Sequence, residues 1–305
     1  AERPDHPGVA HYLIHSYDYP AIADKGLPAA RRYAGIAPAA AHALHMPSHI
    51  FTRLGLWDES IASNRDSAEK ARMYIRQVNP NATSFDELHA IDYLVYAHLQ
   101  QADDAAAAAL VDRLSKADAP LLDINNFAAA YAYAATPARY ALERRQWKEA
   151  AELELRPSNF PWKDHAPAEA IHHFAKAIGA ARTGDLNVAK AAVDRLAEIQ
   201  RGLKGYWAEQ VEIQRLAAQS TLAYAAGFAT EGIRLARAAA DLEDKTEKHP
   251  VTPGPVIPAR ELLAEMLLEE GKTAEAKAEA GRGLKVSPGR RNALRLAANE
   301  ARSDR

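Results

Sequence analysis

The chain contains no cysteine, which excludes disulfides, thiolate zinc sites, iron–sulfur clusters and cysteine nucleophiles. Large aromatic residues are scarce, with 6 Phe and 4 Trp. Neither sign of charge dominates, because the formal net charge is -2, so the strongly basic face of a nucleic-acid-binding protein is not expected. No apolar run approaches the ~18–20 residues needed to span a bilayer. We therefore expect a soluble protein that binds neither nucleic acid nor membranes, and any metal ligands must be His, Asp or Glu.

The first residues carry no signal-peptide pattern and no initiating Met. The chain is therefore interpreted as a processed protein or as a piece of a longer one, and its compartment is not predicted. The oligomeric state is not predicted either.

Alanine makes up more than a fifth of the 305 residues. It is the best helix former and is poor in strands. Small side chains let helices approach closely but bury little area each, so stability is expected to come from stacking many helices rather than from one large core. The composition predicts an all-α protein.

A short pattern recurs along the chain: an apolar helix, a turn residue, an apolar or aromatic residue two positions later, and an alanine-rich second helix. It is clearest at residues 53–60 (RLGLWDES), 145–150 (RQWKEA), 182–189 (RTGDLNVA) and 270–276 (EGKTAEA). Glycine provides the backbone freedom that a tight turn between helices needs. The pattern predicts turns near Ala21, Gly55, Ala102, Arg145, Gly184, Gly227 and Gly271.

This pattern resembles the tetratricopeptide repeat family, whose unit is a helix pair of about 34 residues. The best match is residues 259–277 (ARELLAEMLLEEGKTAEAK), although most intervals between the predicted turns are longer than the family unit. The resemblance implies a right-handed α-solenoid of about seven helix pairs that forms a single array over 1–305. Within it, residues 1–80 are histidine-rich repeats and residues 287–305 a capping helix with a tail. It also implies a concave groove that binds a peptide, a protein or a small-molecule ligand.

The histidines are concentrated near the start of the chain. Five of the 12 fall between residues 11 and 49, namely His11, His15, His42, His45 and His49. His11 and His15 are four residues apart, as are His45 and His49, and residues at this spacing share one face of a helix. Each set therefore predicts a stripe of imidazoles where its helix is unbroken.

The resemblance implies which way these stripes point. In the family, groove-facing side chains lie about 13, 10, 6 and 3 residues before a turn. Counted back from the turns at Ala21, Gly55, Ala102 and Arg145, these positions include His11, His15, Asp18, His42, His45, His49, Thr52, His89, Asp92, Tyr96, Leu99 and Arg139. The resemblance thus brings the histidines to one concave wall.

Two imidazoles one helical turn apart are a common chelate for a divalent cation. We predict metal ligands at His11, His15, His45 and His49, with His172 as a possible addition, and ligand-binding roles for His42, His89, Tyr96 and Arg139. Zinc is the first choice of metal, and copper, nickel and iron stay open. The residues between the paired histidines are YLI and MPS, so the glutamate of an H-E-x-x-H metalloprotease is missing. An enzyme would need Asp18, Asp92 or a spare histidine as its base.

Two other interpretations of the histidines stay open at this point. The rings could simply hydrogen-bond to one another and to the hydroxyls of Tyr12, Tyr17 and Tyr93. Alternatively, they could bind an anion or peptide without a metal, with Arg139 as a further donor. Pro47 complicates the second stripe, since it disfavours helical geometry at Met46. The sequence favours a repeat-type binding protein with a histidine metal site; the alternative is a metal-dependent hydrolase that uses the same groove.

Overall fold

The computed structural model describes residues 6–80, 82–115 and 126–298. Within these residues the secondary structure consists of α-helices and two short 3-10 helices, and β-strands are absent. The prediction of an all-α protein is confirmed. A search of the same residues for a helix that is long and apolar enough to cross a membrane finds none.

The chain forms two compact units. The first extends to Thr136 and also includes the returning segments His249–Gly254 and Lys285–Arg290. Its helices are α1 (Pro7–Tyr17), η1 (Ala23–Gly26), α2 (Leu27–Ile36), α3 (Ala41–His45), α4 (Pro47–Arg53), α5 (Trp57–Val78), α6 (Phe85–Gln100), α7 (Asp104–Ser115) and the first part of α8 (Phe127–Glu143).

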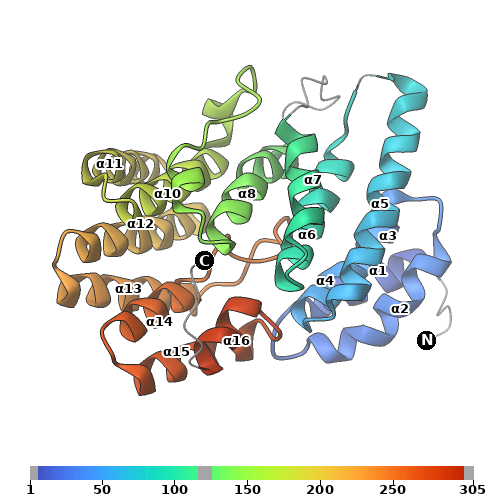
Figure 1. Cartoon of the computed structure of the whole chain (residues 1–305). Coiled ribbons are helices and arrows are strands. Elements are labelled where there is room, and N and C mark those ends of the chain that lie inside the picture. Colours follow the sequence, from blue (N-terminus) through green and yellow to red (C-terminus); the bar gives the residue numbers. More distant parts are fainter. Residues whose placement is uncertain (1–5, 81, 116–125, 299–305) are drawn as a thin grey trace. The chain divides into compact units, whose positions relative to one another are not determined.

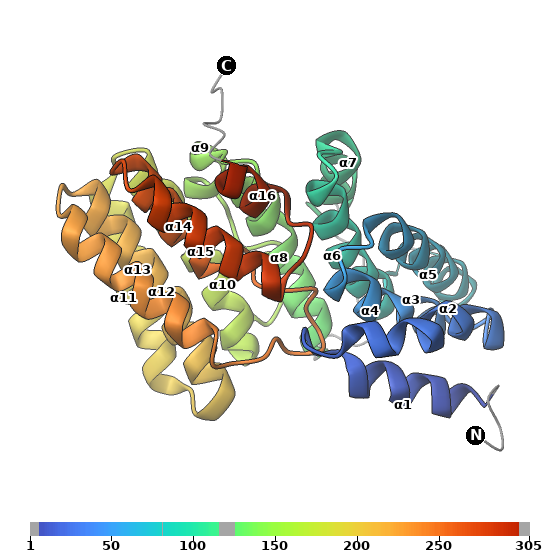
Figure 2. The same cartoon turned by 90° about the horizontal axis from the view of Figure 1, so that it is seen from below.

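Helices of the first unit pack as sequential neighbours. In Figures 1 and 2, α1 lies against α2 and α4, α5 lies against α3, α4 and α6, and α6 lies against α7. The first four helices share a buried core made of Ala10, Ile14, Ala29, Ala30, Tyr33, Ala43, Met46, Ile50 and Phe51. This core fixes α1, α3 and α4, the helices that carry the N-terminal histidines.

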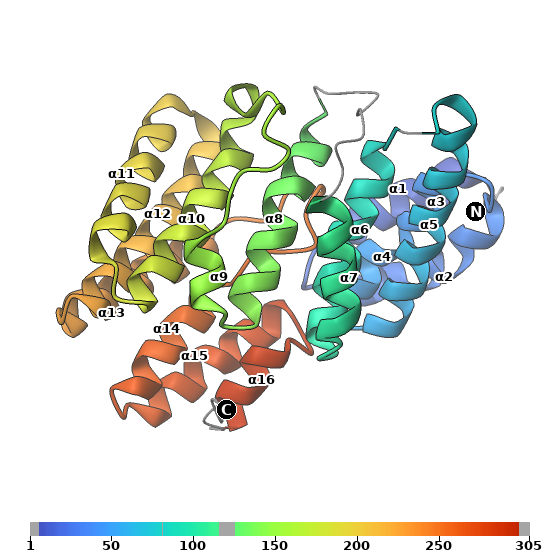
Figure 3. The same ribbon diagram turned by 45° about the horizontal axis from the view of Figure 1, so that its top comes forward.

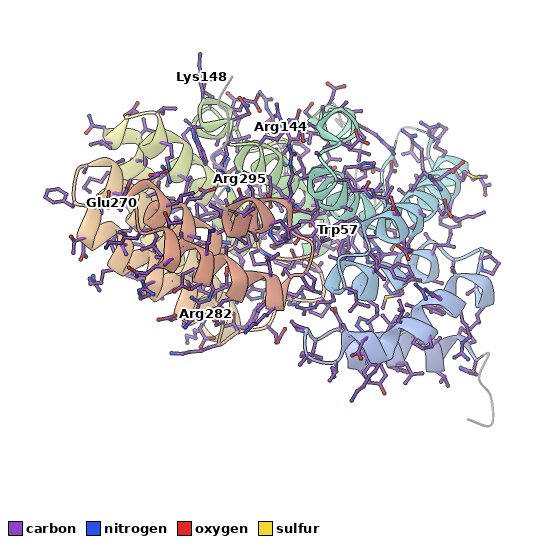
Figure 4. All side chains as sticks on the ribbon, turned by 60° about the horizontal axis from the view of Figure 1, so that its bottom comes forward. Trp57, Arg144, Lys148, Glu270, Arg282 and Arg295 are labelled. Atoms are coloured by element: carbon purple, nitrogen blue, oxygen red, sulfur yellow. The ribbon has the colours of Figure 1, made fainter. Side chains whose placement is uncertain are left out.

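The two returning segments support α6. Tyr93 donates its hydroxyl hydrogen to the carbonyl oxygen of Thr252 (3.1 Å), and Arg290 Nη1 donates to the hydroxyl oxygen of Tyr96 (3.0 Å). Trp57, labelled in Figure 4 at the start of α5, donates Nε1–H to the carbonyl oxygen of Gly289 (3.1 Å). Contacts between residues so distant in sequence hold α6 and the start of α5 in place.

The second unit contains Pro137–Lys248, Pro255–Leu284 and the residues from Arg291 onward. Its further helices are α9 (Trp147–Ala151), η2 (Trp162–His165), α10 (Ala166–Arg182), α11 (Leu186–Gly202), α12 (Gly205–Ala225), α13 (Ala229–Glu243), α14 (Ala259–Glu269), all but the last two residues of α15 (Thr273–Val286), and α16 (Arg291–Ala298). In Figure 3, α10, α11, α12 and α13 follow one another as packed neighbours. Two of its buried clusters, made of Ala180, Ala181 and Ala189 and of Ala264, Ala280 and Leu296, consist almost entirely of alanine. This agrees with close packing of alanine-rich helices.

Six of the seven predicted turns have the same backbone form. The residues Gly55, Ala102, Arg145, Gly184, Gly227 and Gly271 all have positive φ, between 60° and 87°. Each lies two residues after the end of one helix and two residues before the start of the next. The predicted turn at Ala21 differs, because α1 connects to α2 through a longer segment that contains η1. The recurring sequence pattern therefore marks helical hairpins.

Ala102 tests this turn geometry, because it is exposed and adopts a φ of 64° that costs an L-residue free energy. Ala102→Gly is expected to raise the free energy of unfolding by about 0.5–1 kcal/mol, since glycine relieves the strain but gains freedom in the unfolded chain. Denaturant unfolding measures the change. The matched control Ala109→Gly, at an exposed position inside α7, is expected to lower stability by a similar amount. A loss of stability in Ala102→Gly would contradict the assigned turn.

Pro47 interrupts the second histidine stripe less than expected. It occupies the first turn of α4, where its missing N–H costs little. Met46, predicted to leave helical geometry, keeps φ -50° and ψ -39°, which is α-helical. The backbone therefore continues in helical form from α3 into α4, and His45 and His49 stay on one side.

The right-handed solenoid, its single array over 1–305 and the histidine-rich repeats of 1–80 stay predictions. Helix α16 lies within the predicted capping region of 287–305, and residues 299–305 of that region lie outside the described residues.

Candidate metal centre

Six histidines from four helices form one continuous cluster of rings. Helix α1 contributes His11 and His15, α3 contributes His42 and His45, α4 contributes His49, and α6 contributes His89. Ring centroids are 4.7 Å apart for His11–His15, 5.2 Å for His11–His42, 5.6 Å for His15–His49, 6.3 Å for His42–His45, 5.0 Å for His45–His49 and 4.3 Å for His45–His89. The structure thus brings together all five histidines of the N-terminal stripes, and it adds His89.

Three of these residues, His45, His49 and His89, form the histidine triad. Each offers a ring nitrogen, and the three nitrogens lie within 4.8 Å of one another. Their exposed fractions are 2%, 2% and 9%. Metal–nitrogen bonds of about 2.0–2.1 Å in a tetrahedral site place the centroids of two ligating imidazoles about 5 Å apart. The observed 4.3 Å and 5.0 Å for His45–His89 and His45–His49 are close to that spacing, and His49–His89 is wider at 6.5 Å.

His45 is oriented by a buried amide. Its Nδ1–H donates to Oδ1 of Asn64 (2.6 Å). The amide itself is fixed, because Asn64 Nδ2 donates to the carbonyl oxygen of Ser60 (2.8 Å). Asn64 and Ser60 are fully buried. The hydrogen bond fixes the proton on Nδ1 and directs Nε2 of His45 into the triad.

His49 is oriented by a buried carboxylate. Its Nδ1–H donates to Oδ2 of Asp18 (3.0 Å). Arg53 holds Asp18 by donating Nε–H to Oδ1 (2.8 Å) and Nη2–H to the backbone carbonyl (3.0 Å). A carboxylate behind an imidazole is the usual outer partner of a metal-bound histidine, since it fixes the ring and raises the basicity of the other nitrogen.

These two outer hydrogen bonds decide what the triad can hold. With both Nδ1 atoms donating outward, the Nε2 lone pairs of His45 and His49 face each other across 3.1 Å. Two lone pairs at this distance repel unless a proton or a metal ion lies between the rings. Burial, followed by the nearby His89 and His49, lowers the pKa of His45 well below its usual value, so His45 itself does not carry that proton. The donor set fits a divalent cation.

The role of Asp18 predicts a specific change in metal affinity. Asp18→Asn is expected to weaken divalent-metal binding about 10- to 100-fold, because His49 loses the carboxylate that raises its basicity. A competition titration with a chelator measures the affinity, at a temperature where the apo-protein is folded. The apo-protein is also expected to be less stable, since the buried Arg53 loses its counter-ion. Unchanged metal affinity together with lowered stability would restrict Asp18 to a structural role.

The predicted metal ligands His11 and His15 lie beside the triad, together with His42, for which the sequence predicted a ligand-binding role. His42 is exposed, and His11 and His15 are half-buried. Loss of surrounding water lowers the pKa of His11. At His42, whose side chain still reaches solvent, the protein packed around part of the ring lowers the pKa, and the nearby His11 and His15 lower it further. The predicted set of four metal ligands therefore separates into two pairs. His45 and His49 belong to the triad with His89, whereas His11 and His15 lie outside it. The sequence assigned His89 to ligand binding; its place in the predicted concave wall was the only signal that could have found it.

Asp18, Asp92 and Tyr96 are all buried. Asp18 is engaged by Arg53 and His49, which suits orientation of His49 better than proton transfer. Asp92 is 1% exposed and follows His89 by three residues on α6. Tyr96 is 2% exposed, and its ring lies 5.5 Å from that of Trp57. The catalytic roles of the two acids and the binding role of Tyr96 stay predictions.

Arg139 and His172 belong to the second unit. Arg139 is fully buried in α8 and donates Nη1–H to the carbonyl oxygen of Pro255 (2.6 Å). His172 lies in α10, and its ring is 5.0 Å from that of His173. Their predicted roles, in ligand binding and as an additional metal ligand, stay predictions.

The interpretation based on tyrosine hydroxyls gains limited support. Tyr12 is 73% exposed. The hydroxyl of Tyr93 lies 3.5 Å from Nδ1 of His49 but donates to the carbonyl oxygen of Thr252 at 3.1 Å. The shorter bonds of the triad histidines run to Asn64 and Asp18. Tyrosine contacts are therefore secondary in this cluster.

The lowered pKa of His172 is expected to make the stability of the second unit depend on pH. Burial, with the nearby His173 and Lys176, lowers the pKa of His172 to about 4. Because its pKa in the unfolded chain is near 6.5, the unfolded chain takes up the proton first as the pH falls. Stability is expected to be complete above pH 6.5 and to fall by roughly 2–3 kcal/mol between pH 6.5 and 4 through this residue.

Denaturant unfolding in the presence of a chelator, at pH 7 and pH 4.5, measures this effect. His172→Gln is expected to lose less stability on acidification than the wild-type protein does. An equal loss in both proteins would contradict the inferred proton linkage at His172.

Comparison with family models finds no match, and none of the curated proteins matches the sequence. The resemblance to tetratricopeptide repeats therefore stays a prediction, and a functional proposal has to be built on the geometry of the histidine cluster.

Proposed function

We propose that this chain is a divalent-metal-binding protein whose ion is held by the histidine triad. One observation carries the proposal: Nε2 of His45 and Nε2 of His49 face each other at 3.1 Å, while both Nδ1 atoms donate to fixed oxygens. His89 contributes a third ring nitrogen within 4.8 Å of the other two. A cation between the two Nε2 lone pairs would satisfy this arrangement.

Zinc is the proposed metal. Three imidazoles are a usual donor set for Zn²⁺, and copper and nickel also accept nitrogen ligands. Mg²⁺ and Ca²⁺ prefer oxygen ligands. The carboxylate of Asp18 points at His49 rather than joining the three nitrogens. The chemistry of the donor set therefore favours a borderline-soft cation over a hard one.

Titration of the apo-protein tests this proposal. The protein is stripped with a chelator and titrated with Zn²⁺, and thermal unfolding is followed in parallel. We expect tight zinc binding and a higher melting temperature, because a ligand at 100 times its Kd stabilises the folded state by about 2.7 kcal/mol. Mg²⁺ is the matched control and should change neither signal. Absence of zinc binding, or an equal response to Mg²⁺, would contradict the proposal.

Binding of a peptide, a protein or a small molecule in a concave groove is the wider proposal taken from the repeat resemblance. The metal centre does not depend on it. A protein of this kind would combine a helical scaffold with a structural or ligand-recruiting metal ion.

A metal-dependent hydrolase is the second candidate. A set of three imidazoles leaves a fourth coordination position in which hydrolytic zinc sites bind water and lower its pKa. Hydrolysis of ester and phosphoester test substrates by zinc-loaded protein, compared with His89→Ala under the same conditions, tests this candidate. Equal rates in the two proteins would exclude the triad as a hydrolytic centre.

A further inference from the structure

Three histidines of the cluster lie outside the triad and remain to be explained. His11 and His15 come from α1 and His42 comes from α3, and together they form the outer histidine trio. We propose that the outer histidine trio is a second, weaker binding site for a divalent metal ion, beside the triad on its more exposed side. The proposal extends the proposed function of the triad and rests on it for the class of metal.

The ring spacing supports a chelating arrangement. The centroid of His11 is 4.7 Å from that of His15 and 5.2 Å from that of His42. Two imidazoles that ligate one tetrahedral ion have centroids about 5 Å apart. Each of the two pairs centred on His11 therefore has a chelating spacing. Among the described residues, three ligand atoms that already lie within 4.8 Å of one another are found in the triad alone, so the outer histidine trio is the more open arrangement.

The two helices that carry the trio are held together by buried residues. Ala10 and Ile14 of α1 pack in one core with Ala43 of α3 and with Met46, and all four are at most 3% exposed. The hydroxyl of Tyr33, from the same core, lies 3.5 Å from Nδ1 of His11. A site mounted on packed helices loses little conformational freedom when an ion binds.

Exposure and charge both predict that this site is the weaker one. His42 is exposed and His11 and His15 are half-buried, so an ion there keeps part of its water shell. His15 and His42 also contact the triad, with centroids 5.6 Å from His49 and 6.3 Å from His45. Neutral imidazoles do not cancel the charge of an ion in the triad, and that charge repels a second cation nearby. Occupancy is therefore expected to follow the order triad, then trio.

The number of bound ions tests the proposal. Chelator-stripped full-length protein is titrated with Zn²⁺ by calorimetry, and bound zinc is counted by elemental analysis after equilibrium dialysis. We expect one tight and one weaker equivalent in the wild-type protein. The double variant His11→Ala/His42→Ala should keep the tight equivalent and lose the weaker one, and His89→Ala should do the reverse. His98→Ala, a histidine at the end of α6 that pairs with Asp103, is the matched control and should keep both.

The outcomes separate this proposal from the one for the triad. A wild-type protein with the tight equivalent alone, or a double variant that still binds two ions, would overturn the outer site and leave the triad standing. If the wild-type protein binds no tight equivalent but does bind a weaker one that depends on His11 and His42, the proposal for the triad alone is overturned. Circular dichroism melts of each apo-variant show whether it is folded; His42 and His11 are partly exposed, so we expect the double variant to fold.

Discussion

Replacing His89 with alanine is expected to weaken zinc binding at the triad more than ~100-fold. Loss of a direct ligand should exceed the 10- to 100-fold effect typical of an outer hydrogen-bond partner. His89 is a suitable position, because it lies on α6, whose fold is supported by the contacts of Tyr93 and Tyr96 with the returning segments. The affinity is measured by competition with a chromophoric chelator.

His45→Ala should weaken zinc binding as much as His89→Ala does, and it should also lower the stability of the apo-protein. The reason is that the buried Oδ1 of Asn64 loses its shorter hydrogen bond, at 2.6 Å, and keeps the longer one from Ser48 at 3.3 Å. His98→Ala, on the same helix as His89, controls for the removal of a histidine as such and should leave the affinity unchanged. Wild-type affinity in both triad variants would show that the tight ion binds elsewhere.

The second large effect concerns the packing of α9 against α10. A Cβ atom built on Gly179 would lie 2.4 Å from the backbone nitrogen of Ala151 and 2.5 Å from the carbonyl oxygen of Trp147. Both atoms belong to the backbone, so the clash is relieved only by moving the helices apart. Gly179→Ala is expected to lower the free energy of unfolding by about 3 kcal/mol, at the upper end of overpacking effects.

Gly281 offers a matched control for this substitution. It also lies within a helix, α15, and a Cβ atom there would have no neighbour within 4 Å. Gly281→Ala is expected to raise the free energy of unfolding by about 0.5–1 kcal/mol, because alanine is the better helix former. Denaturant unfolding of both variants checks the contrast in sign. A Gly179→Ala protein as stable as wild type would contradict the close approach of α9 and α10.

The local geometry of the fold was largely predictable from the sequence. The pattern predicted turns at Ala102 and Arg145, where glycine is absent, as well as at four glycines, and in the structure all six residues have positive φ. It succeeded because a helical hairpin imposes a fixed spacing between the turn residue and the next helix start. It failed at Ala21, where the connection contains η1 and the spacing no longer applies.

The histidine cluster was predictable in membership, but its inner organisation was not. Helical spacing grouped His45 with His49, and the repeat alignment placed His89 on the same wall. Which three rings converge depends on the side-chain partners Asn64 and Asp18, and on the position of α6. That position is fixed by contacts such as Tyr93 to Thr252, 159 residues apart, which no local pattern encodes.

The most direct test of the metal centre is the coordination of zinc in the loaded protein, measured by anomalous diffraction together with X-ray absorption. We predict a tightly bound ion with three imidazole nitrogens at about 2.0–2.1 Å, supplied by His45, His49 and His89. An ion bound through oxygen ligands, or at His172 in the other unit, would contradict the assignment of the metal centre.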